Sequence, residues 1–184
     1  MNLHSLDEAR LWKLIVKGND DAFAFVYRKY SWDLYKYGHK FTIDSNLIED
    51  VIQDTFVKIF EQRQHLQIRR SIKFYLFSTF RHEIIKRVNH AYQVDSLSDF
   101  HDKIAWEESF ERMLEDQQIL TESKTKLTKA LEALPPRQKE AIFLRYIEAL
   151  TNEEIAELMG IKIPYLYNLI SSGLKTLKST LSTL

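Results

Sequence analysis

The chain has 184 residues, with 26 Lys and Arg against 26 Asp and Glu, so its formal net charge is zero, and it contains no cysteine. Without cysteine there are neither disulfides nor thiolate metal sites, which is compatible with a reducing cytosol, and we expect a cytoplasmic protein. The N-terminus lacks the basic start and apolar core of a signal peptide, and no apolar run approaches the ~20 residues of a membrane span.

Apolar residues recur at helical spacing along most of the chain, and few Gly or Pro residues interrupt them. The sequence therefore predicts an all-α fold with two small helical domains joined by a linker. Four helices are expected in the N-terminal half. The first stops at Gly18, the second starts from an N-cap within residues 19–21, the third is capped by Asp44 or Ser45, and the fourth covers residue 71 to about 89.

The third of these helices has one apolar face and one acidic face. Its apolar residues recur every three or four positions and predict a wide buried stripe. The residues alone leave two interpretations of the other face open, because early acids favour the helix dipole and a charged face is usually just solvated. That polar face carries Glu49, Asp50, Gln53 and Asp54.

The fourth helix and the loop before it combine cations, amides and an aromatic residue. Such residues are what single-stranded nucleic-acid binding requires, although buried aromatics and ordinary surface arginines would also explain them. At about 3.6 residues per turn, one helix face carries Tyr75, Ser78, Thr79, His82, Lys86 and Asn89, and the loop contributes Arg63, His65, Arg69 and Arg70.

Charge is distributed unevenly along the chain. Residues 61–90 are rich in Lys and Arg, whereas residues 95–122 are rich in Asp and Glu. This change predicts three parts: a four-helix domain over residues 1–94, an acidic and partly helical linker over residues 95–125, and a C-terminal domain over residues 126–184.

The C-terminal part has the helix-starting and helix-ending residues of a helix-turn-helix. A proline pair halts one helix and opens the next, and Thr151 with Glu154 forms a capping box. Gly160 supplies a left-handed turn, and Pro164 restarts the last helix. In such a motif the second helix enters the DNA major groove.

Taken together, these features resemble the extracytoplasmic-function (ECF) sigma factors of bacterial RNA polymerase, over nearly the whole chain. A helix-turn-helix alone is weakly specific, whereas three ordered motifs with family spacing are strongly specific. The motifs occupy residues 17–30, residues 49–60, and residues 134–140 together with 153–161.

The resemblance implies a non-catalytic specificity subunit with no cofactor, no metal site and no small-molecule substrate. Its partners would be core RNA polymerase, promoter DNA and, as is common in the family, an anti-sigma factor. The implied contacts with core polymerase are Glu49, Asp50, Gln53 and Asp54. The implied contacts with the single-stranded −10 element are Arg63, His65, Arg69, Arg70, Tyr75, Ser78, His82, Lys86 and Asn89. The implied contacts with the double-stranded −35 element are Lys162, Tyr165, Tyr167, Asn168, Ser171, Ser172 and Lys175.

The last helix departs from the family because it is poor in cations. Places that commonly hold Lys or Arg in the family hold Tyr167, Leu169 and Ser172 here. Fewer cations mean less counterion release, so we expect weak binding to duplex DNA unless polymerase tethers the helix. Lys139, Arg145 and Lys162 would add phosphate contacts, and the packed side would consist of Leu166, Ile170, Gly173, Leu174 and Leu177.

Other classes of protein are less well supported. The six histidines are scattered, and no Gly-rich phosphate loop or Ser/His/Asp signature of an enzyme appears. Two alternatives stay open. One is a helix-turn-helix regulator that does not bind polymerase, and the other is a protein that sequesters polymerase without initiating transcription.

Overall fold

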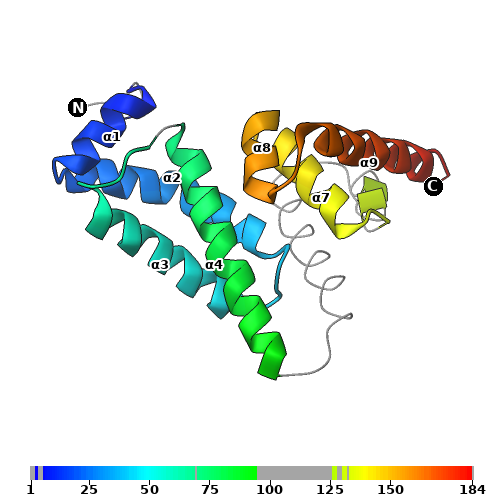
Figure 1. Cartoon of the computed structure of the whole chain (residues 1–184), viewed down its shortest axis with the longest axis horizontal. Coiled ribbons are helices and arrows are strands. Elements are labelled where there is room, and N and C mark those ends of the chain that lie inside the picture. The colour runs from blue at the N-terminus through cyan, green and yellow to red at the C-terminus, as the bar shows by residue number, and fades with distance from the viewer. Residues whose placement is uncertain are drawn as a thin grey trace. The chain divides into compact units, whose positions relative to one another are not determined.

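The computed structural model describes residues 3, 6–68, 70–94, 126–127, 130–131 and 133–183 (Figure 1). All regular elements in these ranges are helices, which confirms the predicted all-α class. The described helices belong to two compact units, one containing α1 to α4 and the other containing α7 to α9. The predicted limits of the domains stay a prediction, and the expected partly helical linker, residues 95–125, lies outside the described residues.

The first unit consists of four helices that follow the predicted order. Their bounds are Glu8–Val16 (α1), Asp20–Gly38 (α2), Ser45–Gln62 (α3) and Ile72–Val94 (α4).

Local capping residues lie at the end of α1 and at the starts of α2 and α3. The Asn19 side chain accepts a hydrogen bond from Ala22 N at 2.8 Å, and Asp44 accepts one from Leu47 N at 3.1 Å. Gly18 follows α1 with a φ of 81°, a left-handed conformation that favours glycine. These contacts confirm the predicted stop and the predicted N-caps.

Close packing in the first unit fixes the orientation of α3. A Cβ added to Gly38 at the end of α2 would lie 2.6 Å from Ile48 Cγ2 and 3.0 Å from Phe80 Cζ. Only glycine therefore allows α2, α3 and α4 to approach at this point. The apolar stripe of α3 is buried in the process, through Ile48, Val51, Ile52, Thr55, Phe56 and Ile59.

A single carboxylate joins three helices of the first unit. Glu8 in α1 accepts a hydrogen bond from the Tyr30 hydroxyl of α2 at 3.1 Å. Its other oxygen accepts from Ile72 N, the first residue of α4, at 2.8 Å. Glu8 thus satisfies one of the unpaired backbone donors at the start of a helix 64 residues away.

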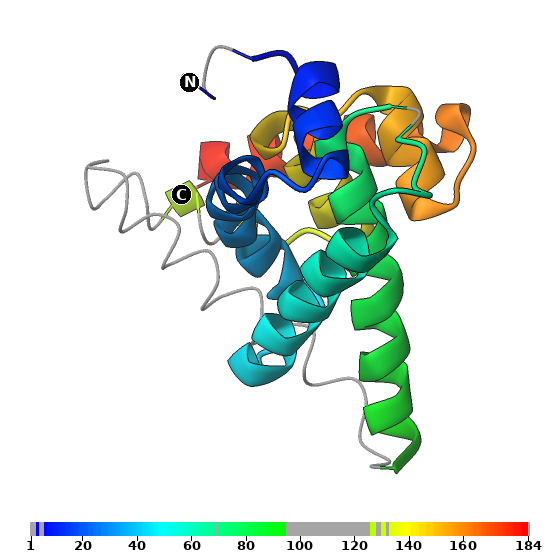
Figure 2. The same cartoon turned by 90° about the vertical axis from the view of Figure 1, so that its left-hand side faces the viewer.

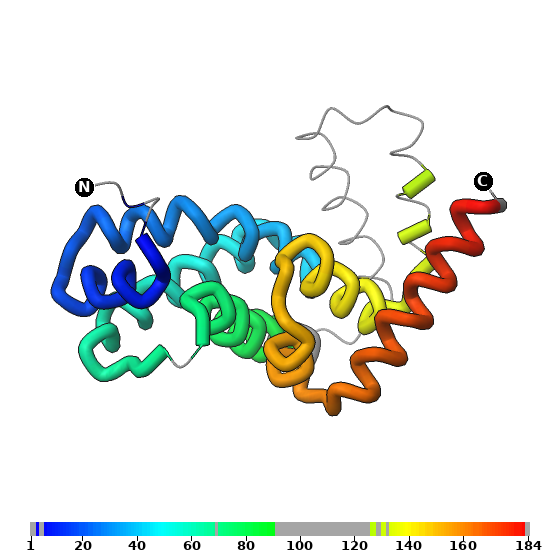
Figure 3. The backbone as a smooth tube through the Cα atoms, turned by 90° about the horizontal axis from the view of Figure 1, so that it is seen from above, coloured from blue at the N-terminus to red at the C-terminus, as the bar shows by residue number. Residues whose placement is uncertain are grey.

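The second unit contains the predicted helix-turn-helix. It is built from α7 (Pro136–Ile142), the π-helical turn η2 (Phe143–Ile147), α8 (Asn152–Met159) and α9 (Ile163–Thr183). Thr151 Oγ1 accepts from Glu154 N at 3.2 Å, and Glu154 Oε2 accepts from Thr151 N at 2.9 Å, which confirms the capping box. Gly160 is left-handed with a φ of 65°. Figure 3 shows the chain turning between α8 (orange) and α9 (red).

The packed side of α9 differs from the prediction at two positions, because Leu169 was not predicted to be packed and Leu174 was. Leu166 and Leu169 are buried, whereas Leu174, predicted to be packed, is 40% exposed. Leu166, Leu169 and Gly173 are spaced by three and four, but Leu174 follows Gly173 directly and lies about 100° around the helix. Gly173 makes the predicted close approach, since an added Cβ would lie 2.6 Å from Ile142 Cδ1.

Candidate functional site

The acidic face of α3 is exposed in the structure. Burial of the apolar stripe on the opposite side leaves its polar residues pointing to solvent, as the helical period requires. All four residues predicted to contact polymerase therefore lie together on one exposed helix face: Glu49, Asp50, Gln53 and Asp54.

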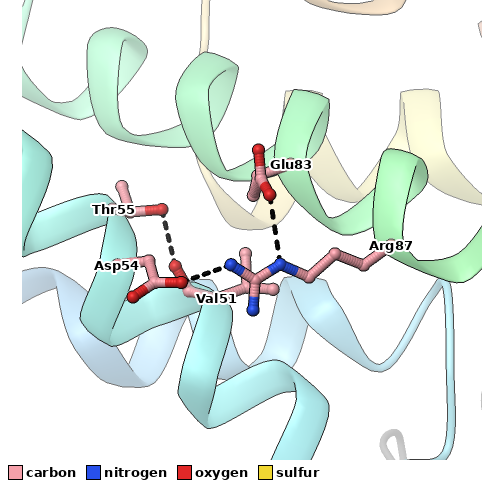
Figure 4. A network of polar contacts seen from close by, with 5 residues as sticks. All are labelled: Val51, Asp54, Thr55, Glu83 and Arg87. Carbon is pink, nitrogen blue, oxygen red and sulfur yellow. Dashed lines mark hydrogen bonds and ion pairs between the residues drawn. The ribbon is translucent and has the colours of Figure 1, made fainter.

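One of these four residues is bound by the neighbouring helix. α3 and α4 cross at an angle (Figures 1 and 2), and Arg87 of α4 forms an ion pair with Asp54 of α3. The Arg87 Nε also donates to Glu83 Oε1 at 3.1 Å, so the guanidinium joins two carboxylates (Figure 4). The hydrogen bond to Asp54 is the main cause that raises the pKa of Arg87.

Arg87 is not among the site residues predicted from the sequence. The only local signal for its role is its spacing of four residues from Glu83, which is typical of an ion pair on one helix face. Its pairing with Asp54 depends on the packing of α3 against α4, which the spacing does not reveal.

A polar groove of about 460 Å³ lies at this junction of α3 and α4. It brings Ser78 and His82, both predicted to contact the −10 element, next to Asp54, which was predicted to contact polymerase. Two expected functions thus meet at one place on the first unit. The groove is lined by Asp54, Thr55, Lys58, Ser78, Thr79, His82, Glu83 and Arg87.

The other residues predicted for the −10 element are placed unequally. His65 and Arg70 in the loop are exposed, as are Lys86 and Asn89 on α4, whereas Tyr75 is half-buried and Arg69 lies outside the described residues.

Arg63 is turned back onto the end of α3. Its guanidinium carbon lies 4.1 Å from the centroid of the Phe60 ring, and its Nη1 donates to the Phe60 carbonyl oxygen. In this conformation Arg63 closes the C-terminus of a helix, where a cation is favoured by the helix dipole.

The residues predicted for the −35 element form one exposed surface at α9. Tyr167 is held by a hydrogen bond from Asn152 Nδ2 of α8 to its hydroxyl oxygen, at 3.2 Å. Residues 163–183 contain two lysines and no Asp or Glu, so every formal charge on this helix is positive. The exposed predicted residues are Lys162, Tyr165, Tyr167, Asn168, Ser171, Ser172 and Lys175.

Two of the neighbouring cations expected to contact phosphate have other surroundings in the structure: one is buried, and the other binds a backbone carbonyl. Lys139 is buried, only 7% exposed, so the expected phosphate contact is wrong for this residue. Arg145 is exposed, and its Nη1 donates to the Leu150 carbonyl oxygen at 3.1 Å, which supports the tight turn before α8.

The described part of the chain offers neither a metal site nor a membrane span. No group of His, Asp and Glu side chains in this part is arranged to hold a metal ion. None of the described helices combines the length and apolarity that a membrane crossing needs.

Family models match both units. The model for sigma-70 region 2 matches residues 26–92, and the model for sigma-70 region 4 matches residues 124–177. The first match covers α3, the loop after it and most of α4, and the second covers α7, α8 and most of α9.

Known proteins agree with these matches. The ECF RNA polymerase sigma factor SigM of Bacillus subtilis is 28% identical over 136 residues, covering 74% of this chain and 80% of SigM. The solved structure of CnrH in complex with the cytosolic domain of CnrY has the same fold, with a TM-score of 0.62, 19% identity and coverage of 96% and 97%. The sigma factor RpoE bound to the anti-sigma factor NepR from Bartonella quintana gives a TM-score of 0.60 at 18% identity, covering 87% of this chain and 96% of RpoE. The chain belongs to the ECF family of RNA polymerase sigma factors.

Proposed function

We propose that this chain binds core RNA polymerase, directs it to particular promoters and helps to open the −10 element. The observation that carries the proposal is the meeting of an exposed acidic face on α3 with a polar, partly basic face on α4. The protein acts by binding, and the chemistry of RNA synthesis belongs to the polymerase.

The acidic face of α3 is the proposed polymerase contact. Glu49 and Asp50 project from one turn of α3, Asp54 projects from the next, and all three are exposed. Carboxylates in such a row suit a basic partner surface, because charge-assisted hydrogen bonds to arginine are stronger than neutral ones.

The groove and the outer face of α4 are the proposed −10 contact. Ser78 and His82 supply hydrogen-bonding groups inside the groove, and Lys86 and Asn89 continue the polar stripe along α4. A base flipped out of the duplex needs hydrogen-bond partners for its edge. The displaced single strand needs cations near its phosphates.

The exposed surface of α9 is the proposed −35 contact. Asn168 suits the bidentate recognition of adenine, and serine hydroxyls suit phosphate or base edges. Because α9 has only two lysines, we expect the polymerase tether to supply most of the effective affinity.

An anti-sigma protein is a further proposed partner. RpoE, which shares the fold of this chain, was solved bound to an anti-sigma factor. A regulator that covers α3 or α9 would compete with polymerase or DNA for the same residues.

Run-off transcription tests the proposal. The full chain is added to core RNA polymerase with a library of genomic promoter fragments, and transcripts are mapped. We expect starts at a defined class of promoters that are absent with core alone. Binding to core without any new start would favour the second candidate, a sequestering protein, which the cation-poor α9 supports.

A further inference from the structure

The surface of α9 includes a carbon-rich shelf beside its polar residues. Tyr167, Ile170 and Leu174 form the shelf, and Ser171, Lys175 and Lys178 complete its lining. Tyr167 and Leu174 are 53% and 40% exposed, although burial of such side chains is normally favourable. This exposed apolar surface offers a place where a partner with apolar groups can bind.

The charges around the shelf indicate what that partner is. The lysines at its C-terminal end are the only formal charges on residues 163–183. A polyanion with apolar groups on its surface matches this combination. A purely apolar protein partner would leave the lysines unused, and a basic one would be repelled.

The length and stiffness of the shelf fit the DNA major groove. From residue 167 to residue 174 an α-helix rises about 10 Å, which corresponds to about three base pairs of B-DNA. The hydrogen bond from Asn152 to the Tyr167 hydroxyl holds the ring at one end of the shelf. A fixed ring loses less conformational freedom on binding than a mobile one.

We propose that the shelf reads the C5-methyl groups of thymines in the −35 element. The thymine methyl is the apolar group that base pairs present in the major groove, and aliphatic or aromatic carbon is its natural partner. The inference rests on the proposed contact of α9 with −35 DNA. It explains how a helix with few cations selects a sequence, because methyl contacts supply specificity without charge.

The test uses the complete chain assembled with core RNA polymerase. This holoenzyme first selects from duplexes randomised across the −35 region. Each thymine in the selected sequence is then replaced by deoxyuridine, which lacks only the methyl group. Burial of one methyl group changes affinity about fourfold, so we expect a loss of about that size at one or more positions.

Matched variants assign the effect to the shelf. Leu174→Ala should bind thymine and deoxyuridine duplexes equally at the position that Leu174 contacts. Leu181→Ala is the control, because Leu181 lies on the same helix outside the shelf lining and is 41% exposed, against 40% for Leu174. This control should keep the full preference for thymine.

Four other outcomes overturn the inference. A selected −35 sequence that is insensitive to deoxyuridine rejects methyl recognition but leaves the −35 contact of α9 in place. A Leu174→Ala variant that loses the same affinity on both duplexes keeps its preference for thymine, which rejects methyl recognition by the shelf. A variant that loses affinity for polymerase instead makes the shelf a protein contact. If no −35 sequence is selected at all, the proposed function of α9 fails together with the inference.

Discussion

Arg87 of α4 and Asp54 of α3 form an ion pair that joins the proposed promoter-binding helix to the proposed polymerase-binding face. The Asp54 side chain is 56% exposed and the Arg87 side chain 30% exposed, so solvent screens the pair. Such a pair contributes about 0–1 kcal/mol to the free energy of unfolding. A polymerase cation that binds Asp54 must compete with Arg87 for this carboxylate.

Charge reversal should therefore have different effects at two positions of the acidic face. Asp50→Lys is expected to weaken binding to core polymerase at least tenfold and to leave the thermal midpoint unchanged, since Asp50 is exposed and lies outside the groove lining. Asp54→Lys is expected to weaken core binding similarly and also to lower the unfolding free energy by up to ~1 kcal/mol. Fluorescence anisotropy with core polymerase and thermal denaturation measure the two effects. Unchanged core affinity in both variants would place the interface elsewhere.

A charge swap separates the two roles of Asp54. Asp54→Arg combined with Arg87→Asp restores an attractive pair between α3 and α4. We expect the unfolding free energy to return toward that of the original protein, while core affinity stays low because the outward charge is reversed. Recovery of core binding by the swap would show that Asp54 acts only through the stability of the helix pair.

Gly173 should not tolerate alanine, although alanine favours helix formation by about 1 kcal/mol. The added Cβ would lie 2.6 Å from Ile142 Cδ1 and 3.4 Å from Gln138 Cβ. We expect Gly173→Ala to lower the unfolding free energy by about 1–2 kcal/mol, measured by urea denaturation. Adding Ile142→Val removes the clashing Cδ1 atom and should recover part of this loss. A single variant as stable as the original protein would argue against the close packing of α7 and α9.

The Thr151 cap should stabilise α8 and the turn into α9. Thr151→Ala removes the acceptor for Glu154 N and is expected to cost about 1 kcal/mol of unfolding free energy. Thr151→Ser keeps the oxygen and serves as the matched control, with nearly unchanged stability. Equal losses in the two variants would mean that the methyl group of Thr151, and not its hydroxyl, matters.

Tyr30 should make the first unit sensitive to alkaline pH. Burial first, and then the negative charge of Glu8, raise the pKa of Tyr30 well above its ordinary value of 10.0. Because the pKa of the folded state is raised, the contribution is complete below pH 10 and is lost as the pH rises further. The unfolding free energy should therefore fall above about pH 10.

Tyr30→Phe provides the comparison. It removes the hydrogen bond to Glu8 and should lower stability at neutral pH by about 1 kcal/mol. Its unfolding free energy should fall less steeply than that of the original protein between about pH 9 and 11. Urea denaturation at several pH values gives both slopes, and the other tyrosines contribute equally to each. Parallel slopes would exclude Tyr30 as the responsible group.

The sequence by itself determined the helices, their caps and the helix-turn-helix. The Asn19 and Asp44 caps, the Thr151–Glu154 capping box and the left-handed Gly160 all depend on atoms within a few residues of one another. Local hydrogen bonds and backbone preferences operate at that range, so residue type and spacing suffice to predict them. The same holds for the exposed acidic face of α3, which follows from the helical period.

Only the tertiary structure decided which groups meet across helices. Asp54 and Arg87 are 33 residues apart, and Glu8 and Ile72 are 64 residues apart. Contacts at such separations depend on how helices pack, and packing depends on the shapes of many side chains at once. The exposure of Leu174 was decided in the same way, because the close approach of α7 at Gly173 sets which face of α9 is buried.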